Sequence, residues 1–305
     1  MDISKDYAVQ MHDISIHFGS NYALKKVNLD VKKGTVHAIL GENGAGKTTL
    51  MNILYGLYQR SSGDMWLYGE KTEIKNPGAA IAKGIGMVHQ HFMLVENFTV
   101  TQNIILGSET VKKAGILDMD RARKEVEEIV ERYGLRVDPD AVISDISVGM
   151  QQRVEILKAL YRGAEILILD EPTAVLTPQE IDELIQIMKR LIESGKTIII
   201  ITHKLKEIKR SADYCTVIRH GEYIDTVSVK EVSQEDLASM MVGRKVRLAV
   251  EKTEAEPGEV VFEVSGLNAK DERGVQVLNQ LSFQVRAGEI FGIAGVDGNG
   301  QTELV

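Results

Sequence analysis

Cysteine is almost missing from this sequence, which holds a single thiol, Cys215, among 305 residues. One cysteine cannot form a disulfide within the chain, so a fold stabilised by internal disulfides is excluded. Reduced cysteines are usual in the cytosol, and the composition is therefore typical of a reducing compartment. Cys215 lies in the apolar run YCTVI, which predicts an ordinary buried thiol without a redox role.

Long apolar runs are missing too. No stretch approaches the roughly 18 consecutive apolar residues that a membrane-spanning helix needs. The N-terminal MDISKDYAVQ also lacks a basic region followed by an apolar one, which a secretory leader would have. The sequence therefore predicts a chain that is neither secreted nor membrane-spanning by itself.

The sequence also lacks an excess of positive charge. Lys and Arg number 36 against 44 Asp and Glu, which gives a formal net charge of -8. Proteins whose main task is to bind a phosphate backbone usually carry a basic face, so this balance argues against nucleic acid as the principal partner. A local basic patch is still compatible with it.

The stretch GENGAGKTT fits the P-loop pattern G-x-x-x-x-G-K-[ST]. Its glycines let successive backbone N–H groups turn inward toward phosphate oxygens. An apolar run before it, at 36–40, and helical spacing after it, at 49–57, predict a strand, a phosphate loop and a helix whose N-terminus faces the phosphates. This context disfavours the alternative, a glycine-rich turn that matches by chance. The predicted nucleotide-binding residues are Gly41, Asn43, Gly44, Ala45, Gly46, Lys47, Thr48 and Thr49.

The surrounding pattern predicts an α/β protein. Short apolar alternations from Tyr7 to Val36 indicate antiparallel strands, which form a β-rich subdomain. Apolar runs that suit strands buried on both faces occur at 36–40, 85–90, 165–170 and 197–202. Helical patterns cover 119–134 and 178–194, and the second begins with a capping box of Thr177 and Glu180. A helical subdomain is expected at about residues 92–162.

An acidic pair, Asp170 and Glu171, ends the buried run ILILD. At the carboxyl end of a parallel strand Asp170 would face a metal ion and Glu171 would polarise an attacking water. His203 follows the neighbouring run TIIIIT and would lie at the same edge. The structural alternatives are a solvated strand end for the carboxylates and an ordinary structural histidine.

The C-terminal part repeats the N-terminal part at an offset of 254 residues. Leu24 corresponds to Leu278, Gly34 to Gly288, and the first phosphate loop to the residues Gly295, Gly298, Gly300, Gln301 and Thr302. We therefore expect a first domain at 1–245, a linker at 246–258 and the N-terminal fragment of a second, similar domain at 259–305. The second loop has Gln301 where the first has Lys47, so we expect it to be degenerate.

These motifs, in this order and spacing, resemble those of the ATP-binding-cassette (ABC) ATPases. GENGAGKT is similar to the family's Walker A motif, MVHQHF to its Q-loop, ISVGMQQRV to its signature, ILILDEPT to Walker B and AVLT to its D-loop. The resemblance implies a P-loop NTPase fold with a RecA-like parallel core, and Mg²⁺-dependent ATP hydrolysis. Thr177 stands where the family usually has an aspartate.

The resemblance also implies roles for single residues. It makes Lys47, Glu171 and His203 catalytic and assigns Mg²⁺ to Thr48, Gln90 and Asp170. It implies that the signature residues are Ser147, Val148, Gly149 and Met150. Phe18 would stack on adenine, with Tyr22 as a competitor and a core aromatic as the structural alternative. Gln90, with the apolar Phe92, Met93, Leu94 and Phe98, would form part of a groove for a permease.

The repeat and the run VHQHFMLVENFTV more narrowly resemble the fused double ATPases of bacterial ribose, galactose and nucleoside importers, the nucleoside branch above all. This implies integral-membrane permease partners, an indirect link to a substrate-binding protein, and a peripheral place on the cytoplasmic face of the membrane. The alternative is a soluble ABC-type ATPase acting in DNA repair or translation. That class is expected to carry a coiled coil, paired cysteines or a long basic linker.

In this family each ATP lies between the Walker A motif of one cassette and the signature of the other. Gln301, Val148 and Met150 depart from the usual residues and would share one composite site, so we expect an unequal pair in which the Lys47 site hydrolyses ATP. The Lys47 site would need a second cassette in cis or a homodimer. We therefore expect the 305-residue chain to bind MgATP and to hydrolyse it poorly as a monomer.

Overall fold

The computed structural model describes residues 3–112, 115–246, 256–271, 274–295 and 299–305. The chain divides into two compact units, Met1–Arg247 and Leu248–Val305, which are described separately. The linker predicted at 246–258 lies largely outside the described residues. The domain boundaries at 245 and 259 stay predictions.

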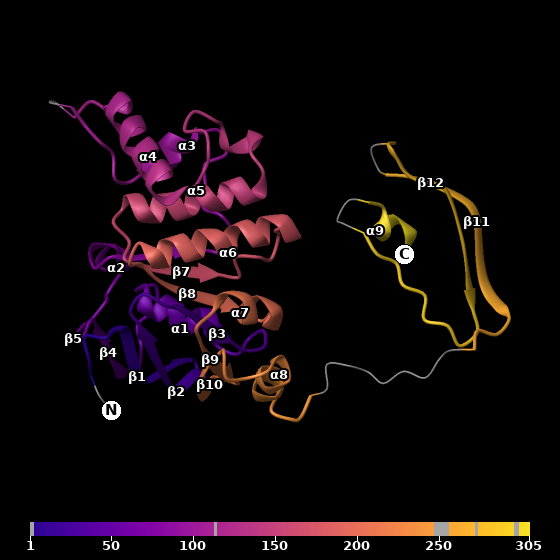
Figure 1. Cartoon of the computed structure of the whole chain (residues 1–305), viewed down its shortest axis with the longest axis horizontal. Helices are drawn as coiled ribbons and strands as arrows, with labels where there is room; N and C mark the ends of the chain where they lie inside the picture. Colours follow the sequence, from indigo (N-terminus) through magenta and orange to yellow (C-terminus); the bar gives the residue numbers. More distant parts are fainter. Residues whose placement is uncertain (1–2, 113–114, 247–255, 272–273, 296–298) are drawn as a thin grey trace. The chain divides into compact units, whose positions relative to one another are not determined.

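A ten-stranded sheet organises the first unit, with the order β5-β4-β1-β2-β10-β9-β3-β8-β7-β6 (Figure 1). Its strands are β1 (Tyr7–Phe18), β2 (Asn21–Lys32), β3 (Val36–Leu40), β4 (Ser62–Leu67), β5 (Glu70–Lys71), β6 (Ile85–Val88), β7 (Ile166–Asp170), β8 (Thr197–Thr202), β9 (Tyr214–Arg219) and β10 (Glu222–Ser228). Its helices are α1 (Lys47–Leu54), α2 (Pro77–Ala82), α3 (Val100–Ile105), α4 (Met119–Tyr133), α5 (Val148–Tyr161), α6 (Pro178–Glu193), α7 (Leu205–Ser211) and α8 (Gln234–Val242), with a short 3-10 turn at Ile143–Asp145.

The sheet combines two kinds of pairing. Strands β1, β2, β4 and β5 pair antiparallel, as the alternating pattern near the N-terminus predicts. Strands β6, β7, β8, β3 and β9 run parallel. The predicted strand at 85–90 is shorter than expected, because its last pair is Val88 with Leu169 and the chain then leaves the sheet.

The parallel strands are buried on both faces because alternate residues enter two different cores. On β8, Ile198 and Ile200 pack with α6, whereas Ile199 and Ile201 pack with α1. An unbroken apolar run such as TIIIIT is what this double burial requires. The strands that carry the site are thus fixed from both sides.

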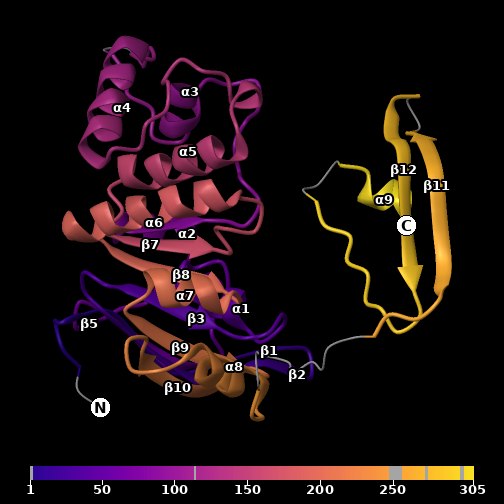
Figure 2. The same cartoon turned by 45° about the vertical axis from the view of Figure 1, so that its right-hand side comes forward.

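Helices α3, α4 and α5 gather beyond α6, away from the antiparallel strands (Figures 1 and 2). The predicted helix over 119–134 is α4, which ends where Gly134 takes a left-handed φ of 63°. The predicted helix over 178–194 is α6, and its capping box between Thr177 and Glu180 is confirmed.

The second unit contains the antiparallel pair β11 (Val260–Lys270) and β12 (Gln276–Arg286) and the short helix α9 (Gln301–Leu304). It repeats local geometry of the first unit at the offset of 254 residues. Lys26 and Gln280 have positive φ of 50° and 49°, and Gly46 and Gly300 have φ of 101° and 92°. A Cβ at position 300 would meet Leu278 Cδ2 at 2.9 Å, as one at position 46 would meet Leu24 Cδ2 at 2.6 Å.

One element of the repeat is missing in the second unit. Residues 290–294 form no strand, although they correspond to β3, and Ile290 is 80% exposed. In the first unit β3 is held between β8 and β9. The described part of the second unit contains no strands that correspond to these two neighbours, so residues 290–294 have nothing to pair with.

Candidate nucleotide-binding site

The phosphate loop lies at the carboxyl end of β3, and its backbone is tightly packed from behind. A Cβ at Gly46 would lie 2.6 Å from Leu24 Cδ2 and 2.8 Å from Ala23 O, and one at Gly41 would overlap Ile218 O. Gly221, in the turn between β9 and β10, donates its N–H to Ala45 O at 3.1 Å. The glycines are thus required by close backbone approach as well as by the left-handed turn at Gly46.

Lys47 opens helix α1, and its ammonium lies over the loop. Its Nζ donates to Gly41 O at 2.8 Å and to Glu42 O at 2.9 Å. Burial lowers the pKa of Lys47, while Glu171 and Asp170 act in the opposite direction. In the described part of the chain no side chain caps the N-terminus of α1. The first N–H groups of this helix and the ammonium therefore present a cationic surface to an anion.

A cavity of about 330 Å³ lies over this loop. Its lining brings together most of the residues predicted from the sequence: Ala23, Asn43, Gly44, Ala45, Gly46, Lys47, Thr48, Thr49, Gln90 and Glu171. Ala23 was not predicted, because nothing in its local pattern marks it. The four signature residues do not line this cavity in the described part of the chain, as expected if they serve another composite site.

The acidic pair lies at the same edge, because Leu40 is in register with Thr202, and Asp170 with Ile201. Asp170 Oδ1 lies 3.5 Å from Thr48 Oγ1. Burial raises the pKa of Asp170, and the Thr48 hydroxyl opposes this shift. A hydroxyl beside a half-desolvated carboxylate is an oxygen pair that suits Mg²⁺.

Glu171 lies between two side chains that the sequence places far apart. Its Oε2 accepts from Gln90 Nε2 at 3.4 Å, and its Oε1 lies 3.1 Å from His203 Nδ1. The backbone of Glu171 is left-handed, with φ of 44°, which is a strained conformation for a residue with a Cβ. With the backbone in this conformation, Glu171 lines the cavity over the phosphate loop.

No group of three or more His, Cys, Asp or Glu side chains that could hold a metal lies in the described ranges. The predicted Mg²⁺ set depends instead on one carboxylate, a hydroxyl and the Gln90 amide. The donor set fits a metal that also takes oxygens from phosphates and water. Thr48 and Asp170 are brought together, and Gln90 lines the same cavity as Thr48 and donates to Glu171.

The aromatic residue that was expected to stack on adenine lies outside this cavity. The Phe18 side chain is 52% exposed, and its ring centroid lies 5.4 Å from that of Tyr58. Its competitor Tyr22 is 64% exposed and contacts His17. Both are open to a ligand ring, and the role of Phe18 stays a prediction.

A polar network behind Glu171 and His203 was missed by sequence reasoning. Lys204 Nζ donates to Thr173 O at 2.9 Å and to Thr173 Oγ1 at 3.2 Å. Thr173 Oγ1 in turn donates to Glu207 Oε2 at 2.6 Å. The network joins the turn after β7 to the start of α7. No local pattern could have found it, because the pairing depends on how β7 and β8 are aligned.

The signature begins helix α5. Ser147 is its N-cap and accepts from the Met150 N–H at 3.3 Å, while Val148 and Met150 are each 40% exposed. Gly149 is buried against α6. In the signature, Gly149 is therefore buried, whereas the apolar side chains of Val148 and Met150 are exposed.

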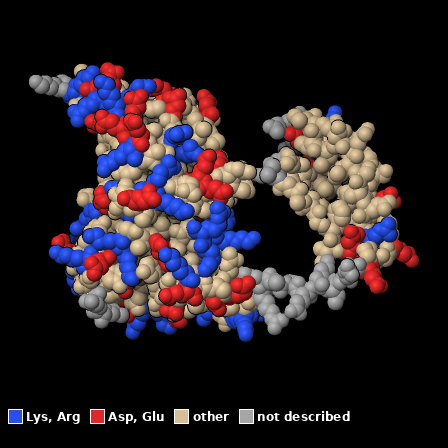
Figure 3. Space-filling view, in the orientation of Figure 1, with Lys and Arg blue, Asp and Glu red and all other residues tan. Residues whose placement is uncertain are grey.

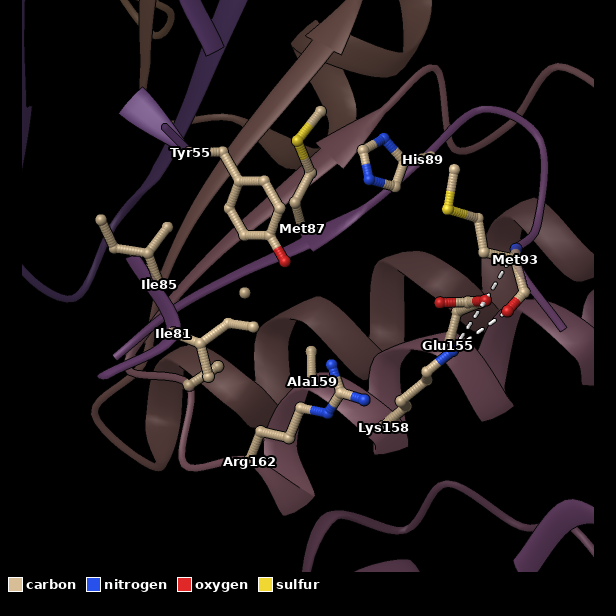
Figure 4. A pocket seen from close by; sticks show the side chains of 12 residues that line it. Tyr55, Ile81, Ile85, Met87, His89, Met93, Glu155, Lys158, Ala159 and Arg162 are labelled. Atoms are coloured by element: carbon tan, nitrogen blue, oxygen red, sulfur yellow. Dashed lines mark hydrogen bonds and ion pairs between the residues drawn. The ribbon is translucent and has the colours of Figure 1, made fainter. Parts of the chain in front are cut away.

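A second cavity, of about 110 Å³, lies between β6, the end of α1 and α5. Figure 4 shows Tyr55, Met93, Lys158 and Arg162 around it, with Glu155 and Lys158 bonded to the Met93 backbone. Arg162 Nε is buried here, and it has no hydrogen-bond partner among the residues that the structure describes. The expected groove included Phe92, Leu94 and Phe98, but only Met93 of that apolar set lines this cavity.

The second phosphate loop is described only in part. Gly300 is the left-handed N-cap of α9, which begins with Gln301 and Thr302. A Cβ at Gly295 would overlap the Gln301 side-chain amide, which thus lies over its loop as Lys47 lies over Gly41. Gly298 lies outside the described residues.

Comparison with known proteins agrees with the geometry. The profile of the ABC transporter family matches residues 24–174. The chain is 58% identical, over 99% of its length, to the nucleoside import ATP-binding protein NupA of Lactococcus lactis subsp. cremoris (strain MG1363), of which it covers 60%. It is 57% identical, over 98% of its length, to the guanosine import ATP-binding protein NupO of Bacillus subtilis (strain 168), of which it covers 59%. The chain thus spans less than two thirds of these relatives.

Among solved structures, cbiO1 from Clostridium perfringens, part of the ABC transporter complex cbiONQ, superposes with a TM-score of 0.67 at 30% identity. The match covers 78% of this chain and 95% of that one. It confirms the predicted cassette fold of antiparallel strands, parallel core and helices. With its phosphate loop, acidic edge and signature in this arrangement, the chain belongs to the ABC transporter family of ATP-binding cassettes.

Proposed function

We propose that this chain is the ATP-hydrolysing part of the energy-coupling subunit of an importer. The observation that carries the proposal is the position of Glu171. It lines the cavity over the phosphate loop and contacts both Gln90 and His203. A carboxylate held between an amide and an imidazole, next to a cationic cradle, suits the activation of a water beside a phosphate.

Different residues of the chain would bind the phosphates, hold the metal ion and orient the water. Lys47 and the N-terminus of α1 would bind the phosphates of ATP, and Thr48 with Asp170 would hold Mg²⁺. Bound Mg²⁺ supplies neutralisation of the phosphate charge. Glu171 would orient the water, and His203 would fix the Glu171 carboxylate from its other side. Gln90 would couple structural changes in this cluster to the chain segment that leads to Met93.

The partner would be an integral-membrane permease that docks at the second cavity. Gln90 lines the nucleotide cavity, and Met93, three residues later, lines the second one and is 65% exposed. A short segment thus links the two sites. No helix in the described ranges is long and apolar enough to cross a membrane. The chain would bind the permease at the cytoplasmic face, and a substrate-binding protein would contact only the permease.

Nucleosides are the substrate class that we propose, with simple sugars as the second. The support is the similarity to relatives named for nucleoside and guanosine import. None of the cavities in the described residues is assigned to the transported molecule, since in such a system the permease and its binding protein would select it. Uptake assays with nucleosides against pentoses and hexoses would separate the two classes.

We also propose an unequal pair of nucleotide sites. The second unit would be the start of a second cassette, in which Gln301 replaces Lys47. A neutral amide lacks the charge-assisted hydrogen bonds of an ammonium, each worth about 1.5–3 kcal/mol. The Lys47 site would hydrolyse ATP, and the Gln301 site would bind nucleotide mainly for structure.

The test is Glu171→Gln in the assembled transporter. We expect ATP binding to persist and turnover to be abolished, since the amide cannot polarise water. The matched control is Glu193→Gln, which removes an exposed carboxylate near the end of α6. Substantial residual turnover in the Glu171→Gln protein would refute the proposal.

The rival function, a soluble ATPase that acts on DNA or ribosomes, has little support. Figure 3 shows basic and acidic side chains interspersed on the visible face of the first unit, without a continuous basic surface. Affinity purification separates the two functions. Recovery with a polytopic membrane protein supports transport, and recovery with ribosomes or DNA supports the rival.

A further inference from the structure

The carboxylate of Glu180 contacts the N-cap residues of both α5 and α6. The two helices lie side by side in both views (Figures 1 and 2). Glu180 is the third residue of α6, and its Oε2 accepts from Thr177 N and from Thr177 Oγ1, each at 3.0 Å. This half of the contact is the capping box of α6 itself.

The other oxygen of Glu180 faces the signature. Ser147 Oγ donates to Glu180 Oε1 at 3.4 Å, and the same oxygen lies close against Gly149. A Cβ on Gly149 would overlap Glu180 Oε1, so the contact requires glycine there. Glu180 therefore accepts from the N-cap residue of α5 and lies against the first turn of this helix, where N–H groups have no partner within their own helix.

The charge of Glu180 suits this position. The positive ends of two helix dipoles point at the same carboxylate. The pKa of Glu180 is lowered, first by the Thr177 N–H and then by the hydroxyls of Thr177 and Ser147 and the Gly149 N–H, against the effect of burial. The group is thus an anion when it contacts both helices.

Two further contacts join α5 to the same region. Gln152 Nε2 donates to Pro172 O at 2.6 Å, in the turn after Glu171. Arg153 pairs with Glu183 of α6. The signature helix is therefore tied to the Glu171 turn and to α6 at three points, and Glu180 is the one that reaches the signature loop itself.

We propose that Glu180 is a positioning residue that holds the signature, Ser147–Met150, in a fixed relation to the stretch 174–177. Both stretches present exposed apolar side chains, Val148 at 40% and Val175 at 63%. A second cassette that docks on one would then meet the other in register. The contact stands on geometry, and only its effect on turnover rests on the proposed ATPase function.

Glu180→Gln tests the proposal because it separates the two halves of the contact. The amide oxygen can still accept from Thr177, so α6 stays capped, but an NH₂ group then faces Ser147 and Gly149. We expect backbone amide exchange at 148–150 to become about tenfold faster, the effect of losing one net hydrogen bond. ATP binding to the chain should change less than about twofold, because Glu180 does not line the nucleotide cavity.

Two controls distinguish positioning from stability. Glu193→Gln changes the same charge on the same helix and should leave exchange at 148–150 unaltered. Thr177→Val removes the α6 cap and should lower the melting temperature without the selective loss of protection at Gly149. In the assembled transporter, Glu180→Gln should lower kcat about tenfold with KM unchanged, as expected when a positioned group loses its geometry.

The outcomes are distinct. The proposal is overturned if the backbone amides at 148–150 exchange as slowly in the Glu180→Gln chain as in the wild type. It is also overturned if Glu193→Gln raises their exchange rate by the same factor as Glu180→Gln. Faster exchange at 148–150 supports it even if the transporter hydrolyses no ATP, in which case the proposed function alone would fail. Faster exchange with unchanged kcat would overturn the proposed consequence for turnover.

Discussion

Glu171 Oε1 lies 3.1 Å from His203 Nδ1, although helix α6 and strand β8 separate the two residues in the chain. The pair exists because β7 and β8 are parallel neighbours that end at the same edge. Behind it, Lys204 binds Thr173, so the two turns that carry the pair are joined a second time. The catalytic pair that we propose is therefore held by its neighbours on both turns.

Lys204→Met should loosen this arrangement. It removes the bonds from Lys204 Nζ to Thr173 and the ion pair with Glu207 at 3.3 Å. We expect kcat to fall about tenfold with ATP affinity nearly unchanged, because orientation is lost and the phosphate loop is untouched. Lys206→Met, an exposed neighbour, is the control. Equal activity of the two variants in a steady-state ATPase assay would contradict the prediction.

Lys47→Gln gives the first phosphate loop a glutamine, the residue that the second loop has at the equivalent position, Gln301. The variant loses charge-assisted hydrogen bonds worth about 1.5–3 kcal/mol, so ATP affinity should fall about 10- to 150-fold. Lys124→Gln, on the exposed face of α4, makes the same change in net charge. Titration with a fluorescent ATP analogue measures both. A Lys47→Gln affinity within a factor of two of the control would argue against the proposed asymmetry.

Gly46→Ala should destabilise the fold without any ligand. Its φ is 101°, and the new methyl would meet Leu24 Cδ2 and Ala23 O. Left-handed strain and overpacking together should cost about 3 kcal/mol. Gly44→Ala has a positive φ too, but its Cβ would meet nothing within 4 Å. It should cost only about 1–2 kcal/mol in urea unfolding. Equal losses in the two variants would show that packing behind Gly46 is unimportant.

Stability should fall as the pH drops below 7, because of His37. Burial lowers the pKa of this histidine to about 3, and its Nδ1 has no partner in the described structure. Between pH 6.5 and 3 the unfolded chain binds a proton that the folded chain does not, so protonation favours unfolding. The contribution lost between pH 7 and pH 5 is about 2 kcal/mol.

His37→Gln should flatten this dependence. Its free energy of unfolding should lose about 2 kcal/mol less than wild type between pH 7 and pH 5. His17→Gln, at an exposed histidine, should keep the wild-type slope. Chemical denaturation at the two pH values measures the difference, and parallel slopes for all three proteins would exclude His37 as the cause.

Much of the site was predictable because the relevant signals are local. The phosphate loop is a contiguous pattern, and Asp170, Glu171 and His203 each follow an apolar run that reads as a buried strand. The carboxyl ends of parallel strands share one edge, so the sequence was enough to predict that these residues lie at the same edge of the sheet. The capping box of α6 was likewise visible, since it depends on residues three positions apart.

Other contacts could not be predicted from the sequence. Ser147 and Glu180 are 33 positions apart, and their contact depends on how α5 packs against α6. Arg162 lines the second cavity because α5 packs against β6, and within the described residues its buried Nε has no hydrogen-bond partner. The predicted apolar groove stays a prediction, because loop residues such as Phe92 and Phe98 have no periodicity that fixes their direction.

The sequence by itself determined the phosphate loop, the acidic strand end, the internal repeat and the family, because each of these is encoded in residues that are near neighbours in the chain. Only the tertiary structure decided that Glu171 lies between Gln90 and His203 and that Glu180 contacts the N-cap residues of two helices. These relationships depend on strand register and on helix packing, which place residues tens of positions apart within hydrogen-bonding distance.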